Sequence, residues 1–273
     1  MTLSLLFSGK FEEYFAQSAT GTPLWLFVHI PKTAGSSLTT ELAEFLRPSH
    51  NIHIDRTETT RSYNQRYDDA VTDFIEEAKQ RRFRFASGHI IEEHTARIRK
   101  ALPDVRMITM LRQPVSRVVS DYRYQRTPMH PTHEEFKKKM PTLAHYVAQL
   151  GESNKMTRHL VPKSIIATGD GQACVNFVMQ NYEFVGVQEM YPVCFQTLTT
   201  LLGNPSVPTV RKRVNEVSEE NPLGLTPELD RQIKSHNTLD TAIYEAFLRC
   251  YRMIREPLLD YVRSRRSEFA RSA

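Results

Sequence analysis

A run that can bind an anion stands near the start of the chain. Residues 29–38 read His-Ile-Pro-Lys-Thr-Ala-Gly-Ser-Ser-Leu. Loops of this kind bind phosphate through backbone N–H groups and the positive end of the following helix, helped by a lysine and by hydroxyl groups. Lys32 supplies a mobile positive charge, and Gly35 lets the backbone approach a ligand closely. The sequence therefore predicts a phosphate-binding loop that consists of Lys32, Thr33, Ala34, Gly35, Ser36 and Ser37.

A serine or threonine helix cap is the simpler interpretation of this run. It accounts for Ser36 or Ser37, but it leaves Pro31 and Lys32 together with Gly35 unexplained. A nucleoside-triphosphate loop would read G-x-x-x-x-G-K-[ST], with the lysine after the last glycine. Here Lys32 precedes Gly35, and this order argues against a kinase of a small molecule, which stays the main alternative enzyme.

A second anion site is predicted within residues 111–122. Arg112 stands at the end of a predicted strand, and Ser120 lies on the second turn of the helix that follows. Both side chains can face one anion. Ser116 is an alternative contact because it lies four residues before Ser120 on the same helix face. Arg117 is predicted to be a structural ion-pair partner.

The elements that must position these residues alternate between strands and helices. The predicted strands are 25–30, 83–88, 105–111 and 184–187, and the predicted helices are 38–46, 67–82, 92–102, 115–124, 142–150, 173–182 and 191–202. Residues 127–141 and 204–227 are predicted as loops, and two helices separated near His236 and Asn237 are expected over about 227–271. Alternation of this kind predicts an α/β fold with a central, mainly parallel sheet flanked by helices. We expect a single domain over residues 1–273, with its core at about 24–251.

Both anion-binding runs resemble motifs of the sulfotransferases that use 3′-phosphoadenosine-5′-phosphosulfate (PAPS). The order P-K-T-A-G-S-S is similar to their 5′-phosphosulfate loop, particularly in the carbohydrate group that includes the heparan sulfate 2-O- and 6-O-sulfotransferases and bacterial relatives. The family's 3′-phosphate motif, L-R-x-P-x-x-R-x-x-S-x-Y, is matched at Leu111, Arg112, Pro114, Arg117, Ser120 and Tyr122. Two shorter blocks, Asn154–Leu160 and Phe184–Glu189, are also similar to family members, with Met156 where glutamine is usual.

The resemblance implies a P-loop-like sulfotransferase fold and a defined reaction. PAPS would be the co-substrate, no metal would be needed, and Arg112 with Ser120 would hold the 3′-phosphate. The sulfuryl group would pass by in-line displacement to a hydroxyl of an acceptor, which the resemblance makes a carbohydrate, glycoconjugate or glycolipid. Lys32 would act in catalysis by meeting the charge on the leaving phosphate.

His89 is the predicted general base, because such a transfer needs a group that accepts the proton of the hydroxyl. It ends the strand-like run Phe85–Gly88 and resembles the histidine of the S/G-H element in the 2-O-type enzymes. A hydrogen-bonded core or surface histidine is the competing interpretation. His29 is a second candidate because it borders the loop, although its position suits packing or orienting the turn. The histidines without such a placement are His94, His130, His133, His145 and His159.

The charge of the chain suggests one further class of function, the binding of polyanions. The formal net charge is +5, and basic clusters occur at 81–84, 137–139 and 211–213, so a polyanion-binding module is a further alternative. No nucleic-acid-binding motif accompanies these clusters, and no nucleic acid partner is expected. The sequence leaves the oligomeric state open.

The cysteines and residues 1–10 indicate in which cellular compartment the protein is expected. Cys174, Cys194 and Cys250 are too few and too far apart for a disulfide framework or a zinc site. The pairs His50/His53 and His130/His133 lack further ligands at metal spacing, so no metal site is predicted. Residues 1–10 show neither a signal peptide nor a membrane anchor. We therefore expect a cytoplasmic protein without stable membrane insertion.

Overall fold

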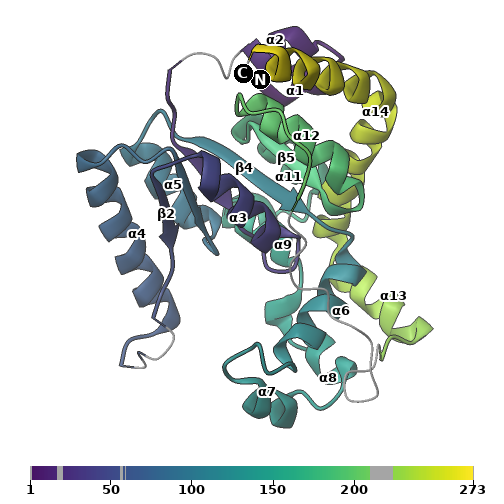
Figure 1. Cartoon of the computed structure of the whole chain (residues 1–273). Helices are drawn as coiled ribbons and strands as arrows, with labels where there is room; N and C mark the ends of the chain where they lie inside the picture. Colours follow the sequence, from purple (N-terminus) through teal and green to yellow (C-terminus); the bar gives the residue numbers. More distant parts are fainter. Residues whose placement is uncertain (1, 17–20, 56–57, 59, 210–223, 273) are drawn as a thin grey trace.

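Among the described residues, an entirely parallel, five-stranded sheet lies between flanking helices (Figure 1). Its strand order is β2-β3-β1-β4-β5. The computed structural model describes residues 2–16, 21–55, 58, 60–209 and 224–272. The strands are β1 (Trp25–Val28), β2 (Ser49–Ile52), β3 (Phe85–Gly88), β4 (Arg106–Leu111) and β5 (Phe184–Val187). The predicted α/β fold with a central, mainly parallel sheet flanked by helices is confirmed.

Burial explains which strands could be predicted. Every residue of β1, β3 and β5 is buried, and such strands occur as continuous apolar runs in a sheet covered on both faces. The edge strand β2 was not predicted. It reads Ser-His-Asn-Ile, and of its four residues only Ile52 is buried, so its sequence carries no apolar signal.

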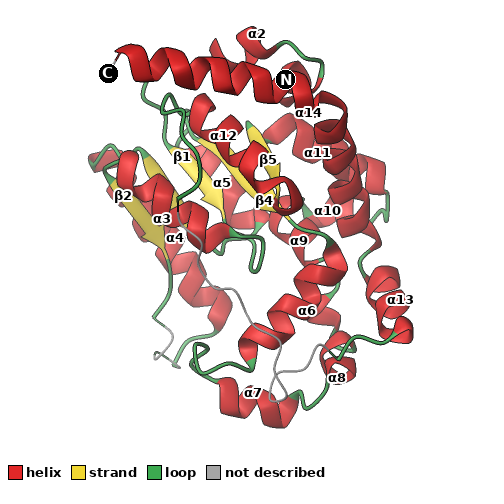
Figure 2. Ribbon diagram, turned by 45° about the vertical axis from the view of Figure 1, so that its right-hand side comes forward, coloured by secondary structure: helices red, strands yellow, loops and turns green. Residues whose placement is uncertain are grey.

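Helices follow the strands and flank the sheet (Figure 2). The helices that carry the strand-to-strand connections and follow β5 are α3 (Gly35–Phe45), α4 (Tyr63–Gln80), α5 (Glu92–Ala101), α6 (Pro114–Gln125), α11 (Gly171–Asn181) and α12 (Tyr191–Leu201). Their starts follow local chemistry. Ser62 and Gln65 form a reciprocal capping box at the start of α4, and Pro114 occupies the first turn of α6, where its missing N–H costs nothing.

The two ends of the chain pack together at one end of the molecule (Figure 1). Two short helices, α1 (Thr2–Phe7) and α2 (Phe11–Ala16), lie against the long helix α14 (Thr238–Ser272). The rings of Phe15 and Tyr261 stack with centroids 5.0 Å apart. The main hydrophobic cluster extends from Leu3 to Val262, beyond both limits of the predicted core.

A smaller hydrophobic cluster surrounds α6 at the opposite end. Helices α8 (Leu143–Val147) and α13 (Pro227–His236) contribute Tyr146 and Ile233, which pack with Val118 and Tyr122 of α6. Residues 127–141, predicted as a loop, contain the helix α7 (His133–Lys139), none of whose residues is buried. An exposed helix has no apolar stripe to reveal it.

Short helices complete the described chain. They are η2 (Leu150–Glu152), α9 (Lys155–Leu160), α10 (Lys163–Ile166) and η3 (Gln188–Met190). The separation of α13 from α14 at Asn237 agrees with the prediction. The basic cluster at 211–213 lies outside the described residues.

Candidate active site

The strand order brings three of the predicted site segments to one edge of the sheet. β1 lies between β3 and β4, with Val28 paired to Gly88 on one side and to Thr109 on the other. The chain leaves β1 toward the β3 side and later returns to form β4 on the other side. Ligands of open α/β sheets bind at such a reversal, beyond the carboxyl ends of the strands. The loop after β1, His89 after β3 and Arg112 after β4 all lie there.

The loop between β1 and α3 has an unusual backbone. Lys32 and Ala34 adopt the left-handed conformation, with φ of 70° and 69°. Thr33 between them is fully buried, and its Oγ1 donates to the carbonyl of Ile30 at 2.9 Å. No side chain caps the start of α3. The turn thus leads directly into an uncapped helix N-terminus, whose N–H groups are suited to an anion.

Gly35 is required by its neighbour His29. A β-carbon at Gly35 would overlap the imidazole of His29. The same imidazole stacks on Phe27 with centroids 5.4 Å apart. The ring of His29 therefore packs between Phe27 of β1 and Gly35, the first residue of α3. Packing of this kind is the role that the position of His29 in the sequence suggested.

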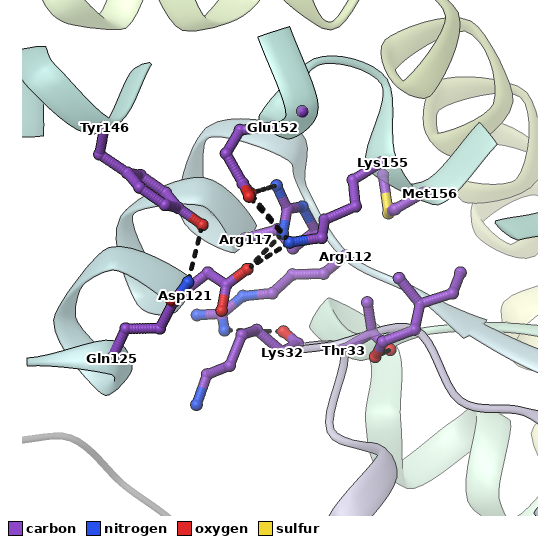
Figure 3. Close-up of polar contacts among 12 residues, drawn as sticks. Lys32, Thr33, Arg112, Arg117, Asp121, Gln125, Tyr146, Glu152, Lys155 and Met156 are labelled. Atoms are coloured by element: carbon purple, nitrogen blue, oxygen red, sulfur yellow. Dashed lines mark hydrogen bonds and ion pairs between the residues drawn. The ribbon is translucent and has the colours of Figure 1, made fainter. Parts of the chain in front are cut away.

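Arg112, which follows β4, contacts Lys32 in the loop after β1 (Figure 3). The Nη1 atom of Arg112 donates to the carbonyl of Lys32 at 3.1 Å. Burial lowers the pKa of Arg112, and the Glu189 carboxylate opposes this effect. The guanidinium stays charged at any physiological pH. Glu189 also accepts from the backbone N–H of Gln113 at 2.9 Å, which ties the start of α6 to the end of β5.

The side chain of Lys32 rests on α6. Its Nζ atom lies 4.1 Å from the centroid of the Tyr124 ring, a cation–π contact. Tyr124 is four residues after Ser120 and eight after Ser116, so the three residues share one helix face. Ser120 lies one helical turn from the tyrosine that touches Lys32, whereas Ser116 lies two turns away and is exposed.

His89 is oriented by a backbone carbonyl. Its Nδ1 atom lies 2.6 Å from the carbonyl oxygen of His29, and the two imidazoles lie 4.2 Å apart at their centroids. Because a carbonyl only accepts hydrogen bonds, Nδ1 carries the proton and Nε2 has the lone pair in the neutral ring. The pairing of Val28 with Gly88 places the two histidines next to each other.

Arg117 forms a buried ion-pair network, as predicted (Figure 3). Its side chain is fully buried and lies 3.1 Å from Asp121 and 3.7 Å from Glu152. Lys155 contacts the same two carboxylates at 3.2 and 3.0 Å. Burial alone would raise the pKa of Asp121, but Lys155 and Arg117 outweigh it and lower that pKa to about 2. Two cations and two anions balance, so the network can fix α6 without a buried net charge.

His159 is a neighbour of the site that the sequence analysis missed. It lies on α9, and its Nδ1 atom is 2.7 Å from the carbonyl of Ile90, the residue after His89. Burial lowers the pKa of His159 to about 3; the bond to the Ile90 carbonyl opposes this shift, and the nearby charges of Lys155 and Arg117 add to it. The block Asn154–Leu160 resembles family members, but the resemblance assigned no catalytic role to any residue in it.

Neutral His159 predicts a dependence of stability on pH. The imidazole titrates near pH 6.5 in the unfolded chain and near 3 in the folded one, so the unfolded state binds more protons between these values. The free energy of unfolding should therefore fall below pH 6.5 by up to about 1.4 kcal/mol per pH unit from this group. Urea titrations at pH 7 and pH 5 measure the loss. His159→Asn should show a smaller loss than His145→Asn, an exposed control, and equal losses would contradict the assignment.

Among the described residues, no group of three or more His, Cys, Asp or Glu side chains is arranged to hold a metal ion. In the same part of the chain, no helix combines the length and apolar character needed to cross a membrane.

The similarities of this chain to known proteins are found among solved structures. No protein-family model and no curated protein matches the sequence. A sulfotransferase from Alicyclobacillus acidocaldarius has a similar structure, with 18% sequence identity and a TM-score of 0.45, over 84% of this chain and 97% of that chain. Mouse sulfotransferase SULT7A1 complexed with PAP is similar at 14% identity and a TM-score of 0.45, over 78% of this chain and 82% of that chain.

Proposed function

We propose that this protein is a PAPS-dependent sulfotransferase that transfers a sulfuryl group to an acceptor hydroxyl by in-line displacement. One observation carries the proposal. The loop containing Lys32 meets Arg112 on one side of β1, while His89 lies beside His29 on the other side, with its Nδ1 on a carbonyl. The two proposed anion-binding segments, which contain Lys32 and Arg112, thus lie at the same edge of the sheet as His89. His89 donates from Nδ1, which leaves Nε2 of the neutral ring available as the base.

The residues present fit the donor. The left-handed turn at Lys32 and Ala34 and the uncapped start of α3 offer backbone N–H groups to the 5′-phosphosulfate. Arg112 and Ser120 hold the 3′-phosphate, and the contact between Lys32 and Tyr124 favours Ser120 over Ser116. PAPS supplies the sulfuryl group on a good leaving phosphate. Lys32 balances the negative charge that the leaving phosphate gains.

His89 accepts the proton of the acceptor hydroxyl. Its Nδ1 proton is engaged by the carbonyl of His29, so the Nε2 lone pair is the basic atom. The hydroxyl oxygen forms its bond to sulfur as the bond from sulfur to the phosphate oxygen breaks, and the hydroxyl proton moves to Nε2. The resemblance to the heparan sulfate 2-O- and 6-O-sulfotransferases favours a carbohydrate or glycolipid hydroxyl as the acceptor.

The Arg112 site predicts a preference among nucleotides. Isothermal calorimetry should show 3′-phosphoadenosine-5′-phosphate binding at least about ten-fold tighter than AMP, because a charge-assisted hydrogen bond contributes about 1.5–3 kcal/mol. Arg112→Ala should remove most of this preference, and Arg112→Lys should keep part of it. Equal affinities of the wild type for the two nucleotides would contradict the 3′-phosphate site.

A transfer assay decides between the proposed activity and a kinase. The protein is incubated with radiolabelled PAPS or radiolabelled ATP and a panel of sugars, glycolipids and small alcohols. We expect label from PAPS alone to reach an acceptor, and we expect turnover to persist in EDTA, since Lys32 and backbone N–H groups meet the leaving-group charge. Transfer from ATP with an absolute Mg²⁺ requirement would support the kinase instead.

A further inference from the structure

The short helix α9 approaches the segment that carries His89. His159 is 7% exposed, and its Nδ1 lies 2.7 Å from the carbonyl oxygen of Ile90. Since the carbonyl can only accept, Nδ1 is the donor, and the bond fixes the orientation of the buried ring. The peptide segment around His89 is therefore held by two imidazole-to-carbonyl bonds. One runs from His89 to His29, and the other runs from His159 to Ile90.

Helix α9 is itself fixed by a distant part of the chain. The fully buried carboxylate of Asp240, in the first turn of α14, accepts from the backbone N–H groups of Met156 at 3.1 Å and Thr157 at 2.7 Å. The hydroxyl of Thr157 donates to the same carboxylate at 2.7 Å. A carboxylate with these donors stabilises the start of a helix.

A residue at the start of α9 in turn caps the start of α14. The side-chain oxygen of Asn154 accepts from the backbone N–H groups of Leu239 at 3.0 Å and Asp240 at 3.2 Å. The side-chain oxygen of Asn237 accepts from the backbone N–H of Asn154 at 2.9 Å. The starts of α9 and α14 therefore cap one another, and α9 is a fixed support rather than a loosely packed turn. At its other end this support presents His159.

We propose that His159 is a positioning residue for His89: it holds the peptide after β3 so that the Nε2 atom of His89 faces the acceptor hydroxyl. This inference rests on the proposed function, in which His89 is the general base. A misplacement of about 1 Å in a reacting group can cost about 100-fold in rate, so a bond that fixes the backbone next to the base affects turnover. His159 need not touch donor or acceptor for this effect.

Two substitutions test the role of the donor at position 159. His159→Leu keeps a side chain of similar size but removes the bond to Ile90, whereas His159→Asn keeps an amide N–H close to the position of Nδ1. We expect His159→Leu to lower kcat by about 10- to 100-fold, with the KM for PAPS and the affinity for 3′-phosphoadenosine-5′-phosphate changed less than about two-fold. His159→Asn should recover most of kcat. Equal losses in the two variants, or full activity of His159→Leu, would overturn the proposal.

A nuclear magnetic resonance measurement gives a readout that does not depend on turnover. In the wild type, the Nδ1 proton of His89 should be visible and should exchange slowly, because it is bonded to the His29 carbonyl. His159→Leu should speed its exchange, and His159→Asn should not. If the wild type transfers no sulfuryl group but the His89 signal still depends on residue 159, the positioning stands and the proposed function fails. An unchanged His89 signal in folded His159→Leu would overturn the positioning even in an active enzyme.

Discussion

Replacing His89 with alanine should lower kcat by about 10²- to 10⁴-fold, the usual contribution of a positioned general base. The affinity for 3′-phosphoadenosine-5′-phosphate should change little, because in the proposed reaction His89 accepts the proton of the acceptor hydroxyl and does not hold the donor. Steady-state kinetics with the true acceptor measures the first effect, and calorimetry measures the second. Activity of the wild type should also fall at acidic pH, because a protonated imidazole cannot accept a proton.

A substitution of His29 tests which of the two adjacent histidines is the general base. His29→Ala removes the ring that packs on Gly35 but keeps the backbone carbonyl that orients His89. We expect a smaller loss of kcat than in His89→Ala, together with some loss of nucleotide affinity because α3 loses a packing contact. Near-normal turnover of His89→Ala would refute the base assignment and make His29 the next residue to test.

Replacing Lys32 with alanine should lower both the rate of sulfuryl transfer and the affinity for the nucleotide. Loss of a cation that balances developing charge costs about 10²- to 10³-fold in kcat, and loss of a charge-assisted bond should also weaken nucleotide binding by about ten-fold or more. Lys32 differs in this respect from His89, whose loss should leave binding nearly intact. Calorimetry and initial rates on the same preparation separate the two patterns.

The contact between Lys32 and Tyr124 supplies matched controls. Tyr124→Phe keeps an aromatic face under the ammonium, and Tyr124→Leu removes the face but leaves the lysine charge in place. Both should be far more active than Lys32→Ala, with Tyr124→Leu the weaker of the two. If Lys32→Ala kept normal turnover and affinity, the loop would not be the donor site.

Much of the fold was predictable because the signals are local. An apolar run followed by Pro31, Lys32 and Gly35 predicts a strand, a tight turn and a helix without knowledge of any other segment. The strand at 184–187 was predicted with its observed bounds because all its residues are buried. β2 and α7 were missed because an edge strand and an exposed helix bury little and therefore show no apolar period.

The sequence by itself determined which residues can bind an anion or accept a proton, since side-chain chemistry and short spacings are local properties. The tertiary structure alone decided which of them meet. The β1–β3 register places His89 on the carbonyl of His29, and the strand order places Arg112 on the carbonyl of Lys32. His159 reaches Ile90 across a long stretch of chain, because α9 is tied to the start of α14. Contacts between segments so far apart depend on packing, and no local pattern of residues encodes them.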